Sequence, residues 1–152
     1  MTASFVKIIN GDISAFSKLY GEIYKKIYYL AYYSLANSQE AVTAVTNAVR
    51  YAYENAESCS SEEELKELIL KKTCEQIVAR FREYRKTPPP YEQYPSYIKA
   101  QLTRLTDAER LSVIVWAVFG YEADKISSLT GLALDIVAKK LESGQTKLSA
   151  KL

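Results

Sequence analysis

The sequence predicts an all-α protein of two small helical domains joined by a proline-rich linker. Apolar residues recur at spacings of three and four along most of the chain, and no segment alternates apolar and polar residues as a strand would. Three of the 4 prolines form the run 88–90, and the fourth follows at Pro95. Because such a run disfavours helix and favours an extended chain, we expect a first domain at residues 1–87, a linker at 88–95 and a second domain at 96–152.

Three helices are expected in the first domain, each preceded by a residue whose side chain can accept hydrogen bonds from the first amides of the helix. The apolar positions of the first helix begin at Ile13, and Ser61 forms a capping box with Glu64 ahead of the third. The expected helices are about 13–36 after Asp12, about 39–55 after Ser38 and about 62–86 after Ser61.

The second domain is expected to end in a helix-turn-helix motif. A short helix at 96–105 precedes a strongly apolar helix that a capping box of Thr106 and Glu109 begins and Gly120 ends. Helices at 122–130 and at about 134–148 flank Gly131, which allows the positive backbone angle of a tight turn. The apolar residues expected in the core of this motif are Ile126, Leu129, Leu132, Ile136, Val137 and Leu141.

Composition excludes several classes of enzyme. The 152 residues include no histidine, which excludes Ser-His-Asp and Cys-His catalysis and removes the commonest metal ligand. Two cysteines cannot staple a chain of this size, and the longest apolar stretch, 113–119, falls far short of the roughly 20 residues that span a bilayer. We therefore expect a cytoplasmic protein that is not an enzyme and uses no metal, cofactor or membrane.

The helix that follows Gly131 is a candidate for reading DNA. Its first turns should expose Leu134, Asp135, Ala138 and Lys139, with Lys140 close by. In a DNA-binding helix-turn-helix such a helix lies in the major groove, with base edges at its N-terminal half and phosphates near its lysines. The alternative is a plain helical bundle with a glycine at a turn. The pattern alone does not decide between the two, because helix-turn-helix geometry also serves protein–protein contacts.

Cations gather at the end of the third helix of the first domain, with Lys71 and Lys72 further up the same helix. The segment 80–86 carries cationic residues interleaved with Phe81 and Tyr84. Cations there can bind phosphates while the rings stack on bases. The alternative is a solvated helix end, where cations suit the carbonyl-rich terminus.

The order of these parts resembles the extracytoplasmic-function group of RNA polymerase sigma factors, within the sigma-70 family. The segment from Gly11 to Tyr20 is similar to the family's Gly-Asp-x-x-Ala-Phe-x-x-Leu-Tyr start. Further residues fall at the family's spacing in its second helical domain, region four: Leu102, Leu105, Glu109, Arg110, Gly120, Ile126, Gly131, Val137, Leu141 and Gly144 through Leu148. The resemblance implies a promoter-melting region-two domain, a linker and a region-four helix-turn-helix domain.

The resemblance also implies roles for single residues. The second helix would dock on core polymerase through Glu40, Thr43, Thr46, Asn47 and Arg50. Two acids of the family's signature in this helix are absent, and residues with hydroxyl or amide groups occupy that segment instead. The minus-ten element would be bound by Asn55, Cys59, Ser60, Lys71, Lys72, Arg80, Arg82 and Arg85, with the loop 55–61 capturing a flipped base. The minus-thirty-five element would be bound by Arg110, Leu134, Asp135, Ala138, Lys139 and Lys140.

These expectations describe a monomeric sigma factor whose partners are core RNA polymerase and promoter DNA, with an anti-sigma protein as a candidate antagonist. One alternative is a sigma-like adaptor or regulator that binds polymerase or a partner without opening promoters. Another is an autonomous helix-turn-helix repressor, which would bind symmetric half-sites as a dimer.

Overall fold

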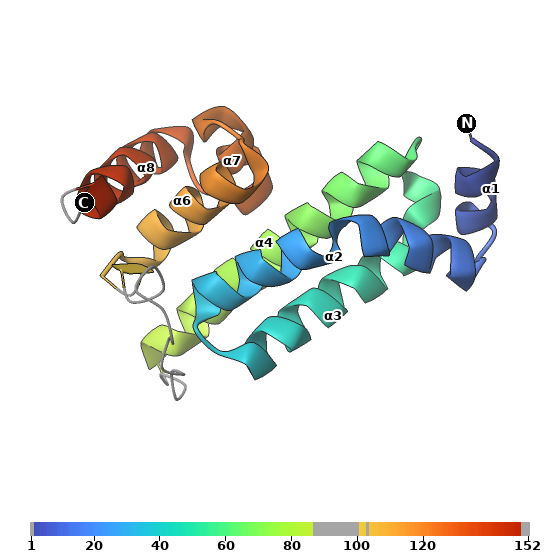
Figure 1. The fold of residues 1–152 in the computed structure, drawn as a ribbon, viewed down its shortest axis with the longest axis horizontal. Coiled ribbons are helices and arrows are strands. Elements are labelled where there is room, and N and C mark those ends of the chain that lie inside the picture. Colours follow the sequence, from blue (N-terminus) through green and yellow to red (C-terminus); the bar gives the residue numbers. More distant parts are fainter. Residues whose placement is uncertain (1, 87–100, 103, 150–152) are drawn as a thin grey trace.

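The computed structural model describes residues 2–86, 101–102 and 104–149, and these residues form helices and no strand. The all-α prediction is confirmed for this part of the chain (Figure 1). The helices are α1 (Ala3–Ile9), α2 (Ile13–Leu35), α3 (Ser38–Glu54), the short 3-10 helix η1 (Ala56–Ser58), α4 (Glu62–Lys86), α6 (Asp107–Phe119), α7 (Ala123–Thr130) and α8 (Leu134–Ser149).

The capping residues explain where most helices begin. Asp12 accepts a hydrogen bond from the Ala15 amide at 3.0 Å and begins α2 as predicted. The prediction for α3 is wrong by one residue, because Asn37, not Ser38, accepts from the Glu40 amide at 2.9 Å. Both side chains are good caps, and the extended backbone at Asn37 decides between them.

Two elements were not predicted. Helix α1 spans 7 residues, with Thr2 accepting from the Phe5 amide and with Phe5 and Ile8 buried. Gly11, at φ 88°, turns the chain from α1 into α2. The other element, η1, is a single turn between α3 and α4. Segments this short contain too few apolar repeats for a periodicity to be recognised.

We call helices α1–α4 the N-terminal helices. Within this group α2, α3 and α4 lie side by side and contact one another, and α1 packs on α2 (Figure 1). The side of α3 that faces its neighbours is built mainly of alanine, including Ala41, Ala48 and Ala52. Small side chains let α2 and α4 approach α3 closely. The fully buried large side chains of this group include Ile27, Leu30, Leu35, Leu65, Ile69 and Ile77.

Helices α6–α8, which we call the C-terminal helices, pack on one another, with α8 in contact with both α6 and α7. Gly131 has φ 76° between α7 and α8, as its place in the turn requires. Gly144 lies so close to α6 that an added Cβ would sit 2.6 Å from Cγ2 of Val113. Of the predicted core, Ile126, Leu129, Val137 and Leu141 are buried.

One core prediction is wrong. Ile136 is 40% exposed, because Val137 occupies the inward position and the next residue on a helix points away from it. Ile13, the first apolar position of α2, is 67% exposed in the first turn of that helix.

The N-terminal and C-terminal helices pack against each other, with α6 on α2 and α7 on α4 (Figure 1). One cluster of buried apolar side chains extends through both groups. The predicted linker at 88–95 lies outside the described residues, as does most of the predicted helix at 96–105. The division into domains at 87 and 96 therefore stays a prediction, while the close packing of the two groups is a property of the described residues.

Candidate nucleic-acid and polymerase interfaces

The first turns of α8 present most of the residues predicted to read DNA. Leu134, Asp135, Ala138 and Lys139 are exposed, and Lys140 is half-buried. The inward side of the same turns is anchored by the fully buried Val137. This surface is nearly neutral in charge, since Asp135 offsets one of the two lysines.

Arg110 lies apart from this surface, on α6, and is buried with 8% of its surface exposed. Its Nε donates to the backbone oxygen of Ser34 at 3.0 Å, its Nη1 to the oxygen of Leu105 at 3.2 Å and its Nη2 to Asp107 at 3.0 Å. The guanidinium also stands 5.8 Å from the centre of the Phe81 ring. In this arrangement Arg110 is bound to its own chain, and a DNA phosphate has no access to it.

The cations of α4 lie on two different sides of the helix. Lys72 and Arg80 point toward α3, where the Lys72 Nζ lies 4.2 Å from the Tyr51 ring centre and the Arg80 Nε lies 3.1 Å from a Glu40 oxygen. Between them the Asn47 amide donates to Gln76 at 3.3 Å. Through these contacts Glu40 and Asn47, which were predicted to bind polymerase, are paired with α4, the helix predicted to bind the minus-ten DNA.

Lys71, Arg82 and Arg85 form the second set of α4 cations, and all three are exposed. Their spacing places them on one side of the helix. Arg82 and Arg85 border a cavity of about 180 Å³ between the end of α4 and the C-terminal helices. Its other lining residues are Val78, Phe81, Asp107, Ala108, Leu111 and Leu132. These two arginines, which were predicted to contact phosphates, are therefore exposed to solvent and lie beside α6.

The loop at 55–61 is closed by local hydrogen bonds. The Asn55 side-chain amide donates to the oxygen of Tyr51 at 2.8 Å, and the Ser60 backbone amide donates to Glu64 at 2.6 Å. Partial burial raises the pKa of the Cys59 thiol, and full burial raises the pKa of Cys74 to about 12. Both thiols are therefore protonated at neutral pH, which disfavours a nucleophilic role.

The residues predicted to bind polymerase divide between two sides of α3. Glu40 and Asn47 face α4, and the Thr43 hydroxyl donates to the oxygen of Gln39 within α3. Thr46 and Arg50 instead border an apolar cavity of about 330 Å³ between α3 and the start of α2. The other residues of this cavity are Ile13, Phe16, Ser17, Tyr20, Val49 and Tyr53.

This α2–α3 cavity was not predicted as a site, although one signal for it was in the sequence. Ile13 follows a capping aspartate directly, and a residue at the first turn of a helix is often beyond the reach of the core. The chain therefore exposes an apolar side chain beside Thr46 and Arg50, at the edge of the surface predicted for polymerase.

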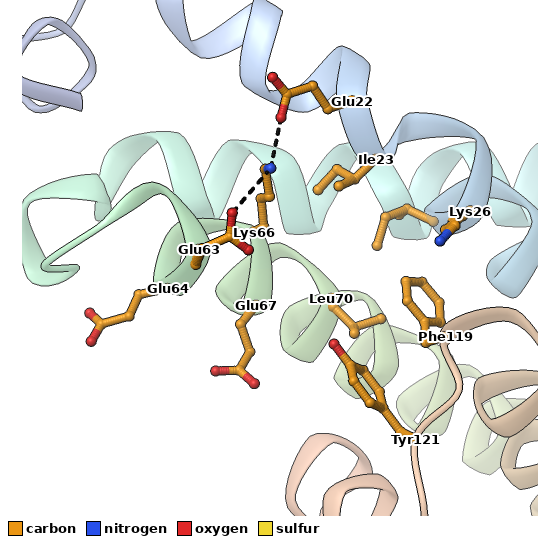
Figure 2. Close-up of a pocket in the computed structure, with 11 residues that line it drawn as sticks. Glu22, Ile23, Lys26, Glu63, Glu64, Lys66, Glu67, Leu70, Phe119 and Tyr121 are labelled. Carbon is orange, nitrogen blue, oxygen red and sulfur yellow. Dashed lines mark hydrogen bonds and ion pairs between the residues drawn. The ribbon is translucent and has the colours of Figure 1, made fainter. Parts of the chain in front are cut away.

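A further cavity, of about 410 Å³, lies where α2, α4 and the turn between α6 and α7 meet (Figure 2). Figure 2 shows the Lys66 Nζ between Glu22, at 2.7 Å, and Glu63, at 3.4 Å. The hydrogen bond from Lys66 lowers the pKa of Glu22. Across the cavity the rings of Phe119 and Tyr121 stack with their centres 6.0 Å apart. These residues come from three distant segments, so no local motif could have pointed to this cavity.

Within the described ranges, no three Cys, Asp or Glu side chains are grouped so that they could hold a metal ion. None of the helices described is at once long and apolar enough to cross a membrane. Comparison of the chain with protein-family models and with curated proteins finds no match to either.

Proposed function

We propose that this protein is an RNA polymerase sigma factor of the extracytoplasmic-function type, which binds core polymerase and directs it to promoters. The observation that carries the proposal is the α7–Gly131–α8 arrangement, in which Val137 and Leu141 anchor α8 and its first turns face solvent. An anchored helix with an exposed N-terminal half is what major-groove reading requires.

The exposed cations of α4 support the second DNA contact of this proposal. Lys71, Arg82 and Arg85 share one side of a 25-residue helix, so they can follow a phosphate backbone. Sequence would be read by α8, while α4 would hold the minus-ten region largely through its backbone.

The α2–α3 cavity supports polymerase binding by apolar contact. Helix α3 lacks two of the acids with which members of the sigma-factor family bind polymerase. In their place Ile13 and Phe16 of α2 and Val49 of α3 offer apolar surface beside Arg50. Burial of apolar surface can replace ion pairs, since each fully buried aliphatic side chain contributes about 1.5–3 kcal/mol.

Retention by immobilised core RNA polymerase tests the proposal. The wild-type chain should be retained, and Ile13→Lys should weaken retention about tenfold by placing an ammonium group in the apolar contact. Val6→Lys is the matched control, because Val6 is also exposed on an N-terminal helix but lies outside the cavity. A wild-type chain that core polymerase does not retain contradicts the proposal.

A sigma-like adaptor is the second candidate, and the loop at 55–61 favours it. Both the Asn55 side chain and the Ser60 amide are engaged in local hydrogen bonds, whereas base capture needs such groups for the nucleotide. Retention by polymerase without promoter-dependent transcription would select the adaptor. Sedimentation as a dimer without retention would select the repressor.

A further inference from the structure

The cavity between the end of α4 and the C-terminal helices, which we call the α4–α6 cavity, combines apolar side chains with exposed cations. Its volume is about 180 Å³. Phe81 of α4 and Leu111 of α6 are buried and line its apolar part. Arg82 and Arg85 border the same cavity and are exposed to solvent. An apolar chamber with cations at its opening is suited to a ligand that carries both an apolar group and a negative charge.

The charge around this cavity is positive, because its carboxylate is already paired. Among the described residues that line the cavity, Asp107 has the only carboxylate, and it accepts from Nη2 of the buried Arg110 at 3.0 Å. Neither Arg82 nor Arg85 forms an ion pair within the part of the chain that the structure describes. The two guanidinium groups are therefore free to bind an anion.

Arginines near the end of a helix do not by themselves indicate a ligand, since cations suit the carbonyl-rich terminus of α4. The position of Arg82 and Arg85 adds a second feature. They stand three residues apart, so they are neighbours on the helix surface, and both border the apolar cavity. The cavity would give a bound anion a place to bury an attached apolar group, which a plain solvated helix end does not offer.

The apolar part of the α4–α6 cavity has room for about one ring. A cavity of roughly 150 Å³ lined by aliphatic and aromatic side chains binds benzene, and this cavity is slightly larger. The Phe81 ring offers a partner for stacking, and the Arg110 guanidinium lies 5.8 Å from its centre. A flat apolar group would lose water-exposed surface against Phe81 and Leu111, which favours binding by about 25 cal/mol per Å².

The two arginines suit a phosphate monoester better than a singly charged anion. A guanidinium group can donate to two phosphate oxygens at once, and a monoester carries close to two negative charges at neutral pH. Two arginines therefore match its charge. Ala108, which also lines the cavity, belongs to the first turn of the 13-residue α6, where backbone amides add partial positive charge.

We propose that the α4–α6 cavity binds a small phosphate monoester with a flat apolar body. Arg82 and Arg85 hold the phosphoryl group, and the body packs against Phe81 and Leu111. This inference goes beyond the proposed function and does not depend on it, because it rests on the shape and charge of the cavity.

Phenyl phosphate is the probe for this chemistry, since it joins one ring to one phosphoryl group. Isothermal titration calorimetry with the full chain at low salt should show a single site with a Kd of about 1 mM, as expected for so small a ligand. Inorganic phosphate has the charged group alone, and phenol has the ring alone. Each should bind at least about tenfold more weakly, because each loses one of the two sets of contacts.

Two variants test the two parts of the site separately. Arg82→Gln with Arg85→Gln should weaken binding of phenyl phosphate at least about tenfold by removing both charges. Ala108→Leu should weaken it to a similar extent by filling the cavity, although both arginines remain. Circular dichroism establishes that each variant is folded, and the comparison of the three ligands on the wild-type chain needs no variant.

Lys72→Gln with Arg80→Gln is the matched control, because it removes two cations from the same helix at residues already paired with carboxylates. It should change the Kd of phenyl phosphate less than about twofold. A Kd above about 10 mM for the wild-type chain overturns the inference. Equal binding of inorganic phosphate, undiminished binding in folded Ala108→Leu, or an equal loss in the control would also overturn it, since each means attraction to surface charge without use of the cavity.

Discussion

Glu109 shows how a single carboxylate can hold two helices of the C-terminal group together. It is 3% exposed on α6, and it accepts from the Ser143 hydroxyl at 2.5 Å and from the Lys147 ammonium at 2.7 Å, both on α8. It also accepts from the Thr106 amide at 2.9 Å in the predicted capping box. Burial would raise the pKa of Glu109, but these hydrogen bonds outweigh it and lower the pKa to about 2.

Replacing Glu109 by glutamine should destabilise the fold in a way that depends on pH. At neutral pH we expect a loss of about 1–3 kcal/mol in the free energy of unfolding, because hydrogen bonds to a charged group are lost. A group whose folded pKa is lowered stabilises the fold above its unfolded pKa, here near 4.5, and that contribution declines as the pH falls toward 2. Urea unfolding of wild type and Glu109→Gln at several pH values should therefore give curves that converge below about pH 4.5.

Glu142→Gln is the control for this measurement, because Glu142 lies on α8 next to the Glu109 partner Ser143 but is exposed. It should change stability by less than about 0.5 kcal/mol at any pH. A difference between wild type and Glu109→Gln that stays constant from neutral pH to pH 3 would contradict the assigned role of the carboxylate.

The role of Glu109 as a cap could be predicted from sequence, and its contacts with Ser143 and Lys147 could not. A capping box spans four residues and is visible as a local pattern. The partners on α8 lie more than thirty positions away, and only the packing of α6 on α8 brings them into reach. For Arg110 the local sequence did not indicate the binding partner. Its guanidinium can donate equally well to a phosphate and to a backbone carbonyl, and only the packing of α6 on α2 places it at the Ser34 oxygen.

Helix α4 combines paired and unpaired cation surfaces, and this division predicts how DNA binding depends on salt. Arg82 and Arg85 are exposed, so Arg82→Gln with Arg85→Gln should reduce the slope of log affinity against log salt by about 2. Lys72→Gln with Arg80→Gln is matched in charge, but Lys72 pairs with Glu75 and Arg80 with Glu40. That second pair of substitutions should change the slope by less than half as much. Fluorescence anisotropy of a labelled duplex over a salt series measures both, and equal slopes for the two variants would contradict the division.

Helix positions were predictable because they depend on local chemistry. The N-cap at Asp12, the capping box at Thr106 and the glycines at 120 and 131 place the helix boundaries as the sequence predicted. The two sides of α4 were not predicted, although the helix was. Which side of a helix faces a neighbour depends on the neighbour, and the pairing of Arg80 with Glu40 exists only because α3 lies alongside.

The packing of α6 on α2 is the feature of the whole chain that sequence reasoning missed. A run of prolines predicts a linker, and a linker is compatible both with separate domains and with domains that dock on each other. Docking here joins buried apolar side chains of both groups into one cluster, to which Leu35 of α2 and Leu111 of α6 both belong. Neither helix shows by periodicity alone which of its apolar residues serve this purpose.

A core shared by both groups predicts that they unfold together. Trp116, the single tryptophan, lies on α6 and reports the C-terminal helices, whereas labelling of the buried Cys74 reports the N-terminal helices. In wild type the urea midpoints from the two probes should coincide, because each group stabilises the other through the packing of α6 on α2 and of α7 on α4. Lys125→Glu replaces the ion pair of Lys125 on α7 with Glu67 on α4 by two carboxylates without touching either core, so it should separate the two midpoints. Lys66→Glu breaks the pair with Glu22 inside the N-terminal helices and should leave the midpoints coincident. Two distinct midpoints in wild type would mean that the groups fold independently, and that the packing of α6 on α2 and of α7 on α4 contributes little to stability.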